Sequence, residues 1–361
     1  MLPELKTPIP GPRSRALLER LGRVESPNVT FLNGAICWEE AEGTNVWDAD
    51  GNRLLDLTAA FAVAAIGHRH PATLRAMRQQ ADTLIHGMGD VHPSRIKVEL
   101  LELLAEIAPG DLSLTILGCN GADAIEAALK TALLTTRRPG VVAFTGGYHG
   151  LSYGAVALSG RAEFAAPFDA QLNPCVRFAE YPDGARVTLE QSLQSVEQAI
   201  RDLDTQDIPV GAIVVEPIQG RGGVVVPPER FLRAIQEAAR SEHALLVCDE
   251  IYTGCGRTGT WFACDAEGVV PDLLCIGKGL SSGFPISACI GTPGTMAGWP
   301  ESTGEALHTY TFLGHPLGCA MAIASLNTIR HDGLVEKATA DGIWLGALLQ
   351  EQLGGHPGIG G

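Results

Sequence analysis

From about residue 70 onward, short apolar runs alternate with stretches whose apolar residues recur at helical spacing. Runs rich in valine, isoleucine and leucine have the length of buried strands at residues 113–118, 140–147, 211–217, 244–250, 272–278 and 286–291. Residues 122–137 and 228–241 carry the spacing of amphipathic helices. Continuous apolar strands alternating with helices predict an α/β fold with a mostly parallel sheet flanked by helices.

The two ends of the chain carry different patterns. Residues 44–58 read as a hairpin around the turn dipeptide Asp50-Gly51. Residues 334–353 have the pattern of a helix, and the glycine-rich stretch GGHPGIGG follows them. Because such a turn usually leads into another element, we expect this chain to be cut short at its C-terminal end.

Composition narrows the classes of partner. The 361 residues include 26 basic and 41 acidic side chains, for a formal net charge of −15. This balance argues against nucleic acid and anionic membrane as partners, since both require a cationic surface. Nine cysteines without CxxC spacing predict reduced thiols rather than a disulfide framework. We predict no membrane span and no metal site, and expect a cytoplasmic location.

Polar side chains follow three of the predicted strands. Lys278 comes after DLLCIG, Asp249 and Glu250 after ALLVC, and Glu216 after GAIVV. In open α/β sheets, ligands bind at the carboxyl ends of the strands. A lysine amine in an apolar place is shifted toward its neutral form and can then form a Schiff base with a carbonyl. The alternative for Lys278 is a lysine that extends its charge to solvent from a strand end.

A carboxylate at the floor of such a pocket needs a cation as a partner. For Asp249, a protonated pyridine nitrogen would serve, and a lysine Schiff base with an aspartate at that nitrogen is the usual protein contribution to pyridoxal phosphate chemistry. The alternative is a helix cap or turn carboxylate. An anion site is predicted at the backbone N–H groups of Gly121 and Ala122, where a helix opens. Its alternative is an ordinary helix start with Asn120 as N-cap.

A flat cofactor would also need an aromatic ring against its face. The segment TGGYHGLSYG places Tyr148 and His149 in a glycine-rich turn after a predicted strand. A stacked tyrosine would hold a pyridine ring in plane. The alternative is a surface tyrosine in a loop.

Several segments together resemble the class III pyridoxal-phosphate aminotransferases of fold type I. These are GNRLLDLTAAFAVAAIGHRHP, GADAIEAALK, GGYHG, VVEPIQGRGG, VCDEIYTGCGRTG, DLLCIGKGLSSGFPISA and HTYTFLGHPLGCA, in the family's order from about residue 40 to 330. The resemblance implies a large cofactor domain at residues 61–330. It also implies a smaller α/β domain built from residues 1–60 and 331–361, whose C-terminal part we expect to be incomplete.

The resemblance also implies residue roles. Lys278 would carry the cofactor, Asp249 would pair with its ring nitrogen, and Gly121 and Ala122, with Asn120, would bind its phosphate. Tyr148 would stack on the ring with His149 beside it. The family forms homodimers with active sites between the subunits, so Thr311 would reach the phosphate bound by the partner subunit.

Some positions depart from the family pattern. Tyr252 stands where many members carry a glutamine that contacts the ring hydroxyl. Leu151 stands where members acting on 4-aminobutyrate often carry an arginine, so we expect a different substrate. Glu216 would pair with the family's arginine for the substrate carboxylate, which is expected beyond residue 361. Arg221 and Arg257 lie near these motifs in sequence, but their spacing gives no reason to assign the carboxylate-binding role to either.

The expected activity is transfer of an amino group between an amine or amino acid and a keto acid, with ping-pong kinetics. Two alternatives stay open on the sequence. One is an amino-acid racemase or epimerase of the same family, and the other is a catalytically degenerate paralogue.

Overall fold

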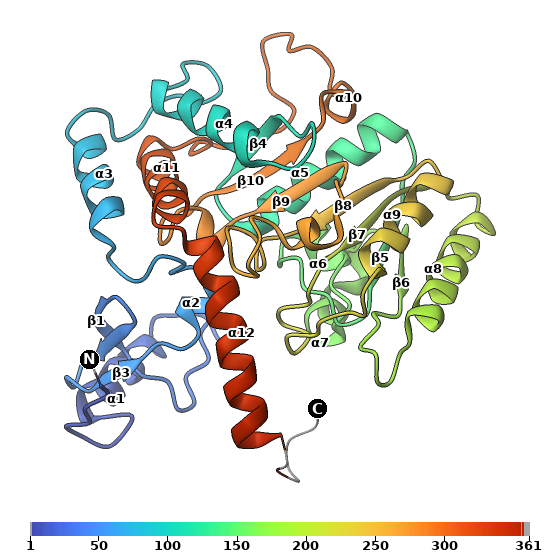
Figure 1. The fold of residues 1–361 in the computed structure, drawn as a ribbon. Helices are drawn as coiled ribbons and strands as arrows, with labels where there is room; N and C mark the ends of the chain where they lie inside the picture. The colour runs from blue at the N-terminus through green and yellow to red at the C-terminus, as the bar shows by residue number, and fades with distance from the viewer. Residues whose placement is uncertain (1, 355, 357–361) are drawn as a thin grey trace.

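The fold is built on a central seven-stranded sheet (Figure 1). The computed structural model describes residues 2–354 and 356. Along the sheet the strands follow the order β4-β10-β9-β8-β7-β5-β6, and β10 is antiparallel to both of its neighbours while the other neighbouring pairs are parallel. Their bounds are β4 Leu114–Gly118, β5 Gly140–Phe144, β6 Val176–Ala179, β7 Val210–Val215, β8 Leu245–Asp249, β9 Leu273–Ile276 and β10 Ser287–Gly291. The predicted α/β class is confirmed, and every predicted strand is present.

Helices cover both faces of the sheet, which explains why its strands are apolar throughout. Helix α5 (Gly121–Thr136) lies on one face, and α8 (Leu189–Asp204) and α9 (Phe231–Ser241) lie on the other. In β5, Val141 and Ala143 pack into the cluster around α5, whereas Val142 and Phe144 pack into the opposite cluster. This alternation follows from the two-residue period of a strand and leaves no face for polar side chains.

A helical layer packs beside β4. Helix α11 (Pro316–His331) contacts both α3 (Pro71–Ala81) and α4 (Arg95–Ile107). The remaining short helices are α2 Ala59–Ala62, α6 Tyr153–Ala157, α7 Ala162–Ala165 and α10 Pro293–Met296, with 3₁₀ turns at Ala166–Gln171, Ala263–Glu267 and Lys278–Leu280.

The N-terminal segment forms a separate three-stranded antiparallel sheet. Its strands are β1 (Trp38–Glu42), β2 (Asn45–Asp48) and β3 (Arg53–Leu55), preceded by α1 (Pro12–Leu21). The predicted hairpin is therefore confirmed, with β1 as an additional strand. Asp50, in the hairpin turn, accepts hydrogen bonds from Arg13 N and Ser14 N, both at 2.8 Å. It thereby ties the first turn of α1 to this small sheet.

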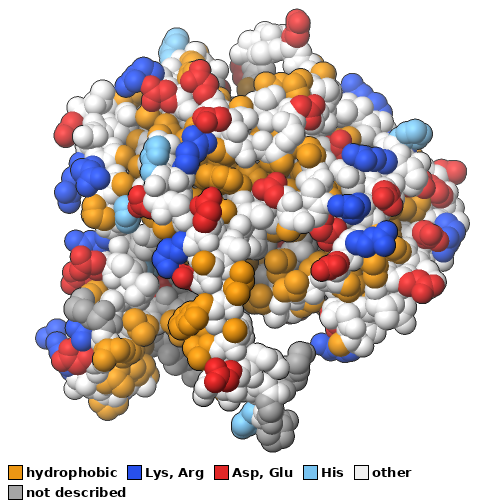
Figure 2. Space-filling view, in the orientation of Figure 1, with side chains coloured by type: hydrophobic (Ala, Val, Ile, Leu, Met, Phe, Trp, Pro, Cys, Tyr) orange, Lys and Arg blue, Asp and Glu red, His pale blue; other side chains and the backbone are white. Residues whose placement is uncertain are grey.

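Helix α12 (Leu334–Leu353) matches the range predicted from the sequence. It packs against α11 at its start, and every residue from 341 to 353 is exposed. Apolar side chains are part of this exposed surface in Figure 2: Ile343, Trp344, Leu345, Leu348, Leu349 and Leu353. Residues 355 and 357–361 of the glycine-rich end lie outside the described part of the chain, and the division into a large and a small domain stays a prediction. Among the described helices, none combines the length and apolar character needed to cross a membrane.

Candidate active site

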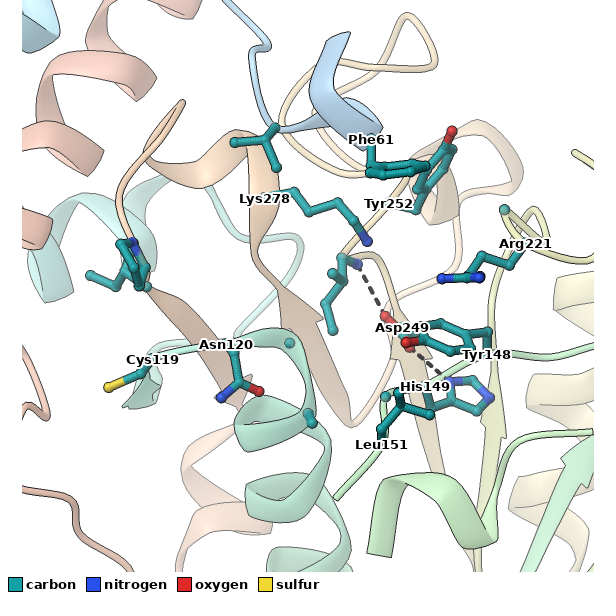
Figure 3. Close-up of a pocket in the computed structure, with 18 of the residues that line it drawn as sticks. Phe61, Cys119, Asn120, Tyr148, His149, Leu151, Arg221, Asp249, Tyr252 and Lys278 are labelled. Atoms are coloured by element: carbon teal, nitrogen blue, oxygen red, sulfur yellow. Dashed lines mark hydrogen bonds and ion pairs between the residues drawn. The ribbon is translucent and has the colours of Figure 1, made fainter. Parts of the chain in front are cut away.

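A cavity of about 620 Å³ opens at the carboxyl ends of β7, β8 and β9 (Figure 3). Because these strands are parallel and adjacent, the residues at their ends meet at one edge of the sheet. Asp249 is the last residue of β8, Glu216 follows β7, and Lys278 lies just beyond β9. All three line the cavity, as the sequence predicted.

Lys278 enters the cavity from a strained backbone position. Its φ angle is +40°, a left-handed conformation that non-glycine residues seldom adopt. Its Nζ lies 5.2 Å from the centre of the Tyr252 ring. Burial lowers the pKa of the Lys278 amine, although the charges of Asp249 and Glu216 oppose the effect. A larger fraction of the amine is therefore neutral and nucleophilic than for a lysine in water.

Asp249 lies at the floor of the cavity and is 4% exposed. Its Oδ2 lies 2.7 Å from His149 Nδ1, and its Oδ1 accepts a hydrogen bond from Ile251 N at 3.1 Å. Burial would lower the pKa of His149, but the hydrogen bond and charge of Asp249, together with Glu216, outweigh it and raise that pKa. The imidazole therefore orients Asp249.

The raised pKa of His149 gives a pH-dependent stability. A group whose pKa is higher in the folded state stabilises that state fully below its unfolded pKa, about 6.5, and the contribution is lost as pH rises through the folded value. We expect the difference in unfolding free energy between the wild type and His149→Asn, without cofactor, to be largest near pH 6. It should shrink toward pH 9 in urea titrations. A difference that grows with pH would contradict this assignment.

Helix α5 begins at the predicted anion site. Asn120 caps it by accepting from Asp123 N at 3.2 Å, and Asp123 Oδ2 accepts in return from Cys119 N at 2.8 Å. The capping alternative is therefore correct for Asn120, yet in the described structure the N–H groups of Gly121 and Ala122 have no protein acceptor. They line the cavity beside the positive end of the helix dipole. The start of α5 therefore combines a side-chain cap with two N–H groups that can bind an anion.

Tyr148 and His149 come from the loop after β5. Tyr148 N donates to Glu216 Oε1 at 2.8 Å, and Gly220 N donates to Glu216 Oε2 at 3.0 Å. Burial and the charge of Asp249 raise the pKa of Glu216, although His149 opposes this. Glu216 thus ties together the two loops that form one wall of the cavity. The substrate role expected for Glu216 stays a prediction.

Tyr252 lies on the loop after β8. A Cβ on Gly220 would stand 2.9 Å from Tyr252 Cγ, so the tyrosine ring packs closely against this glycine. Buried Glu250 fixes the base of the loop by accepting from Ala263 N at 2.9 Å and from the Thr253 hydroxyl. Burial raises the pKa of Glu250, which these hydrogen bonds oppose. Glu250 therefore has a structural role, while Tyr252 faces Lys278.

Thr311 is the predicted site residue that does not line this cavity. It is exposed in the segment before α11. Its contact with a partner subunit stays a prediction.

Sequence reasoning missed Arg221 and Phe61 as cavity residues. Arg221 follows a strand-end glutamate within a glycine-rich loop, and that position was the available signal. Phe61 lies in α2, where all residues from Ala59 to Ala62 have φ between +48° and +68°. Because non-glycine residues rarely take this left-handed conformation, no sequence pattern indicates it.

The residues present fit pyridoxal 5'-phosphate. An amine and a carboxylate face the same cavity, a helix N-terminus provides N–H donors for a phosphate, and a tyrosine offers its ring as one wall. Gly121 leaves room beside this cradle, since a Cβ there would stand 2.9 Å from Ile251 Cδ1. The fold and site define an enzyme that uses this cofactor.

Comparison with known proteins identifies the family. The model of the family Aminotransferase class-III matches residues 27–358, and the chain belongs to this family of pyridoxal-phosphate-dependent aminotransferases. It is 37% identical over 317 residues to acetylornithine aminotransferase of Methanopyrus kandleri. This match covers 87% of this chain and 75% of that protein.

Solved structures agree. A thermostable (S)-enantioselective omega-transaminase from Thermomicrobium roseum superposes with a TM-score of 0.87 at 29% identity, covering 96% of this chain and 81% of that one. The ornithine aminotransferase of Toxoplasma gondii, solved with partial occupancy of pyridoxal phosphate at its active site, gives 0.82 at 29% identity. That match covers 94% of this chain and 77% of that one.

Proposed function

We propose that Lys278 and Asp249 are the catalytic pair of this aminotransferase, acting on a primary amine or amino acid and a keto acid. The observation that carries the proposal is their convergence from neighbouring strand ends on one cavity. When bound, pyridoxal phosphate supplies an aldehyde that condenses with amines and a ring that accepts electron density. The protein's own residues bind and orient the cofactor and the substrate and move the proton.

Lys278 is proposed to anchor the cofactor and to move the proton. Its amine is partly buried and its pKa is lowered, so it can accept a proton from the substrate Cα and return it at the next reacting carbon. Asp249 is proposed to hold a proton on the pyridine nitrogen, because a buried carboxylate favours a cation beside it. His149 keeps Asp249 oriented through the 2.7 Å contact.

The remaining residues are proposed to bind and orient the cofactor. Gly121 and Ala122 offer N–H groups to the phosphate, with Asn120 at the same helix start. Tyr148 is proposed to stack on the ring and Tyr252 to lie near its hydroxyl. Leu151, 57% exposed, gives the cavity an apolar wall, and this supports a donor other than 4-aminobutyrate.

A homodimer is proposed, with Thr311 of each chain reaching the partner's site. The support is an apolar surface formed by two segments that are distant in sequence. They meet where Thr309 Oγ1 donates to Asp90 Oδ2 at 2.8 Å and where the rings of His86 and Phe312 lie 5.4 Å apart. Exposed apolar side chains gather on these segments: Ile85, Met88, Val91, Leu307 and Phe312.

Sedimentation equilibrium should give twice the 38.0 kDa chain mass. A single-chain mass would contradict the dimer. The cytoplasmic location stays a prediction.

One half-reaction tests the activity. The enzyme loaded with pyridoxal phosphate is given an L-amino acid or a primary amine without a keto acid acceptor. We expect one equivalent of keto or aldehyde product per site and no further turnover until acceptor is added. Accumulation of the D-isomer without keto acid would favour the racemase alternative. Absence of any product across amine classes would favour the degenerate paralogue.

A further inference from the structure

We infer that Arg221 binds the carboxylate of the substrate in this site, and that the enzyme's amino donors carry a carboxylate. This inference rests on the proposed function and extends it to the substrate class. It concerns a specificity-determining residue in the loop that follows β7.

Hydrogen bonds hold the backbone just before Arg221 and at its own carbonyl. Gly220 N donates to the buried carboxylate of Glu216 at 3.0 Å, and Gln219 Nε2 donates to Thr145 O at 2.7 Å. The carbonyl oxygen of Arg221 accepts a hydrogen bond from Arg161. The loop is therefore fixed, while the side chain extends into the cavity beside Tyr148 and opposite Lys278 (Figure 3).

The guanidinium group is oriented by aromatic rings. Its Cζ lies 4.6 Å from the centre of the Tyr148 ring and 5.2 Å from that of Phe164. A cation–π contact restricts the position of the guanidinium and uses none of its N–H donors. No carboxylate or other acceptor within the described residues bonds to these donors, and the nearby Glu163 pairs with Arg161 at 2.6 Å. The donors of Arg221 are available to a ligand.

Among the charged residues that line the described cavity, Arg221 is the one suited to bind a substrate carboxylate. Asp249 is paired with His149, and Glu216 accepts two backbone N–H groups. Lys278 is needed for the reaction itself. Among the described lining residues, Arg221 is the remaining permanent cation, and its charge is close enough to contribute to the lowered pKa of Lys278.

The rest of the wall is mostly apolar, with Phe61, Val63, Leu151, Ile251, Phe284 and Ile286 lining it. A carboxylate is costly against such a surface unless a cation meets it. A planar guanidinium can donate two parallel hydrogen bonds to a carboxylate, which fixes the orientation of a substrate as well as binding it. A substrate amine directed at Lys278 would thus be oriented by its carboxylate at Arg221.

Two matched pairs of amino donors test the inference: L-alanine with ethylamine, and 5-aminopentanoate with 1-aminobutane. The members of each pair differ by one carboxylate, placed next to the amine in the first pair and far from it in the second. For Arg221→Gln we expect KM for the carboxylate member of at least one pair to rise by about 10- to 100-fold, as for lost hydrogen bonds between charged groups. The carboxylate-free partner should change less than about twofold, and Arg221→Lys should recover part of the loss.

Arg257→Gln is the matched control. Arg257 lies on the neighbouring loop, donates to Ala62 O at 3.5 Å and does not line the cavity. The Arg257→Gln variant should leave KM unchanged for both members of each donor pair. Equal losses for both members in Arg221→Gln, or unchanged KM for both carboxylate donors, would overturn the inference.

A binding measurement separates this inference from the proposed function. Glutarate carries carboxylates and no amine, so its dissociation constant for the cofactor-loaded protein, measured by calorimetry, does not depend on turnover. We expect the dissociation constant for glutarate to rise about tenfold or more in Arg221→Gln. Inactivity of the wild type with every donor would contradict the proposed function, whereas equal glutarate affinities in both proteins would contradict the role of Arg221.

Discussion

Lys278→Ala is expected to abolish amino transfer, with a fall in kcat of about 10⁴-fold or more. The variant loses the amine that binds the cofactor covalently and the group that moves the proton, and general acid–base catalysis alone contributes about 10²- to 10⁴-fold. The visible absorbance band of the covalently attached cofactor should disappear. Stopped-flow kinetics and an absorbance spectrum measure both effects on one sample.

A second lysine and an added amine complete this test. Lys337→Ala removes a surface lysine that pairs with Asp341 on α12, and it should leave both the rate and the spectrum unchanged. Methylamine added to Lys278→Ala should restore part of the rate, because a free amine can replace the missing base. A variant that keeps the wild-type absorbance band would show that the cofactor is attached elsewhere.

Asp249→Asn is expected to lower kcat by about 10- to 1000-fold with little change in fold. Asparagine has the same shape but no charge, and an opposite charge within a few ångströms shifts the pKa of its partner by about 1 to 3 units. Each unit changes the protonated fraction of the partner about tenfold. The pH profile of kcat, measured on the cofactor-loaded variant, should therefore lose activity first at high pH.

Asp272→Asn provides the control at the opposite edge of the same sheet. This half-buried carboxylate precedes β9 and accepts from Leu246 N at 2.8 Å. Its removal should lower stability and leave kcat unchanged. If both variants lost stability equally and Asp249→Asn kept its rate, Asp249 would be a structural residue only.

The secondary structure was predictable where burial is uniform. Strands β7, β8 and β9 are covered on both faces, so their apolar runs indicate them directly. Strand β6, with the sequence VRFA, escaped prediction because it lies at the edge of the sheet and only Ala179 is fully buried. The antiparallel direction of β10 was also missed, because an apolar run has the same composition in either direction.

That Lys278 and Asp249 line the same cavity was predictable for a physical reason. Parallel strands bring their carboxyl ends to one edge, so residues that end β8 and follow β9 must be neighbours in space. Arg221 and Phe61 were not predictable as site residues by this reasoning. Their positions depend on a loop held by Glu216 and on a left-handed turn, and neither leaves a periodic pattern in the sequence.

The sequence by itself determined the order of strands and helices, the strand-end acid and lysine, and the helix start at Gly121, because these follow from local periodicity and chain direction. Only the tertiary structure decided which charges are paired, which are free, and in which direction the surroundings shift the pKa of Lys278 and of His149. Those properties depend on distances between segments remote in the chain and on the exclusion of water, which local sequence does not encode.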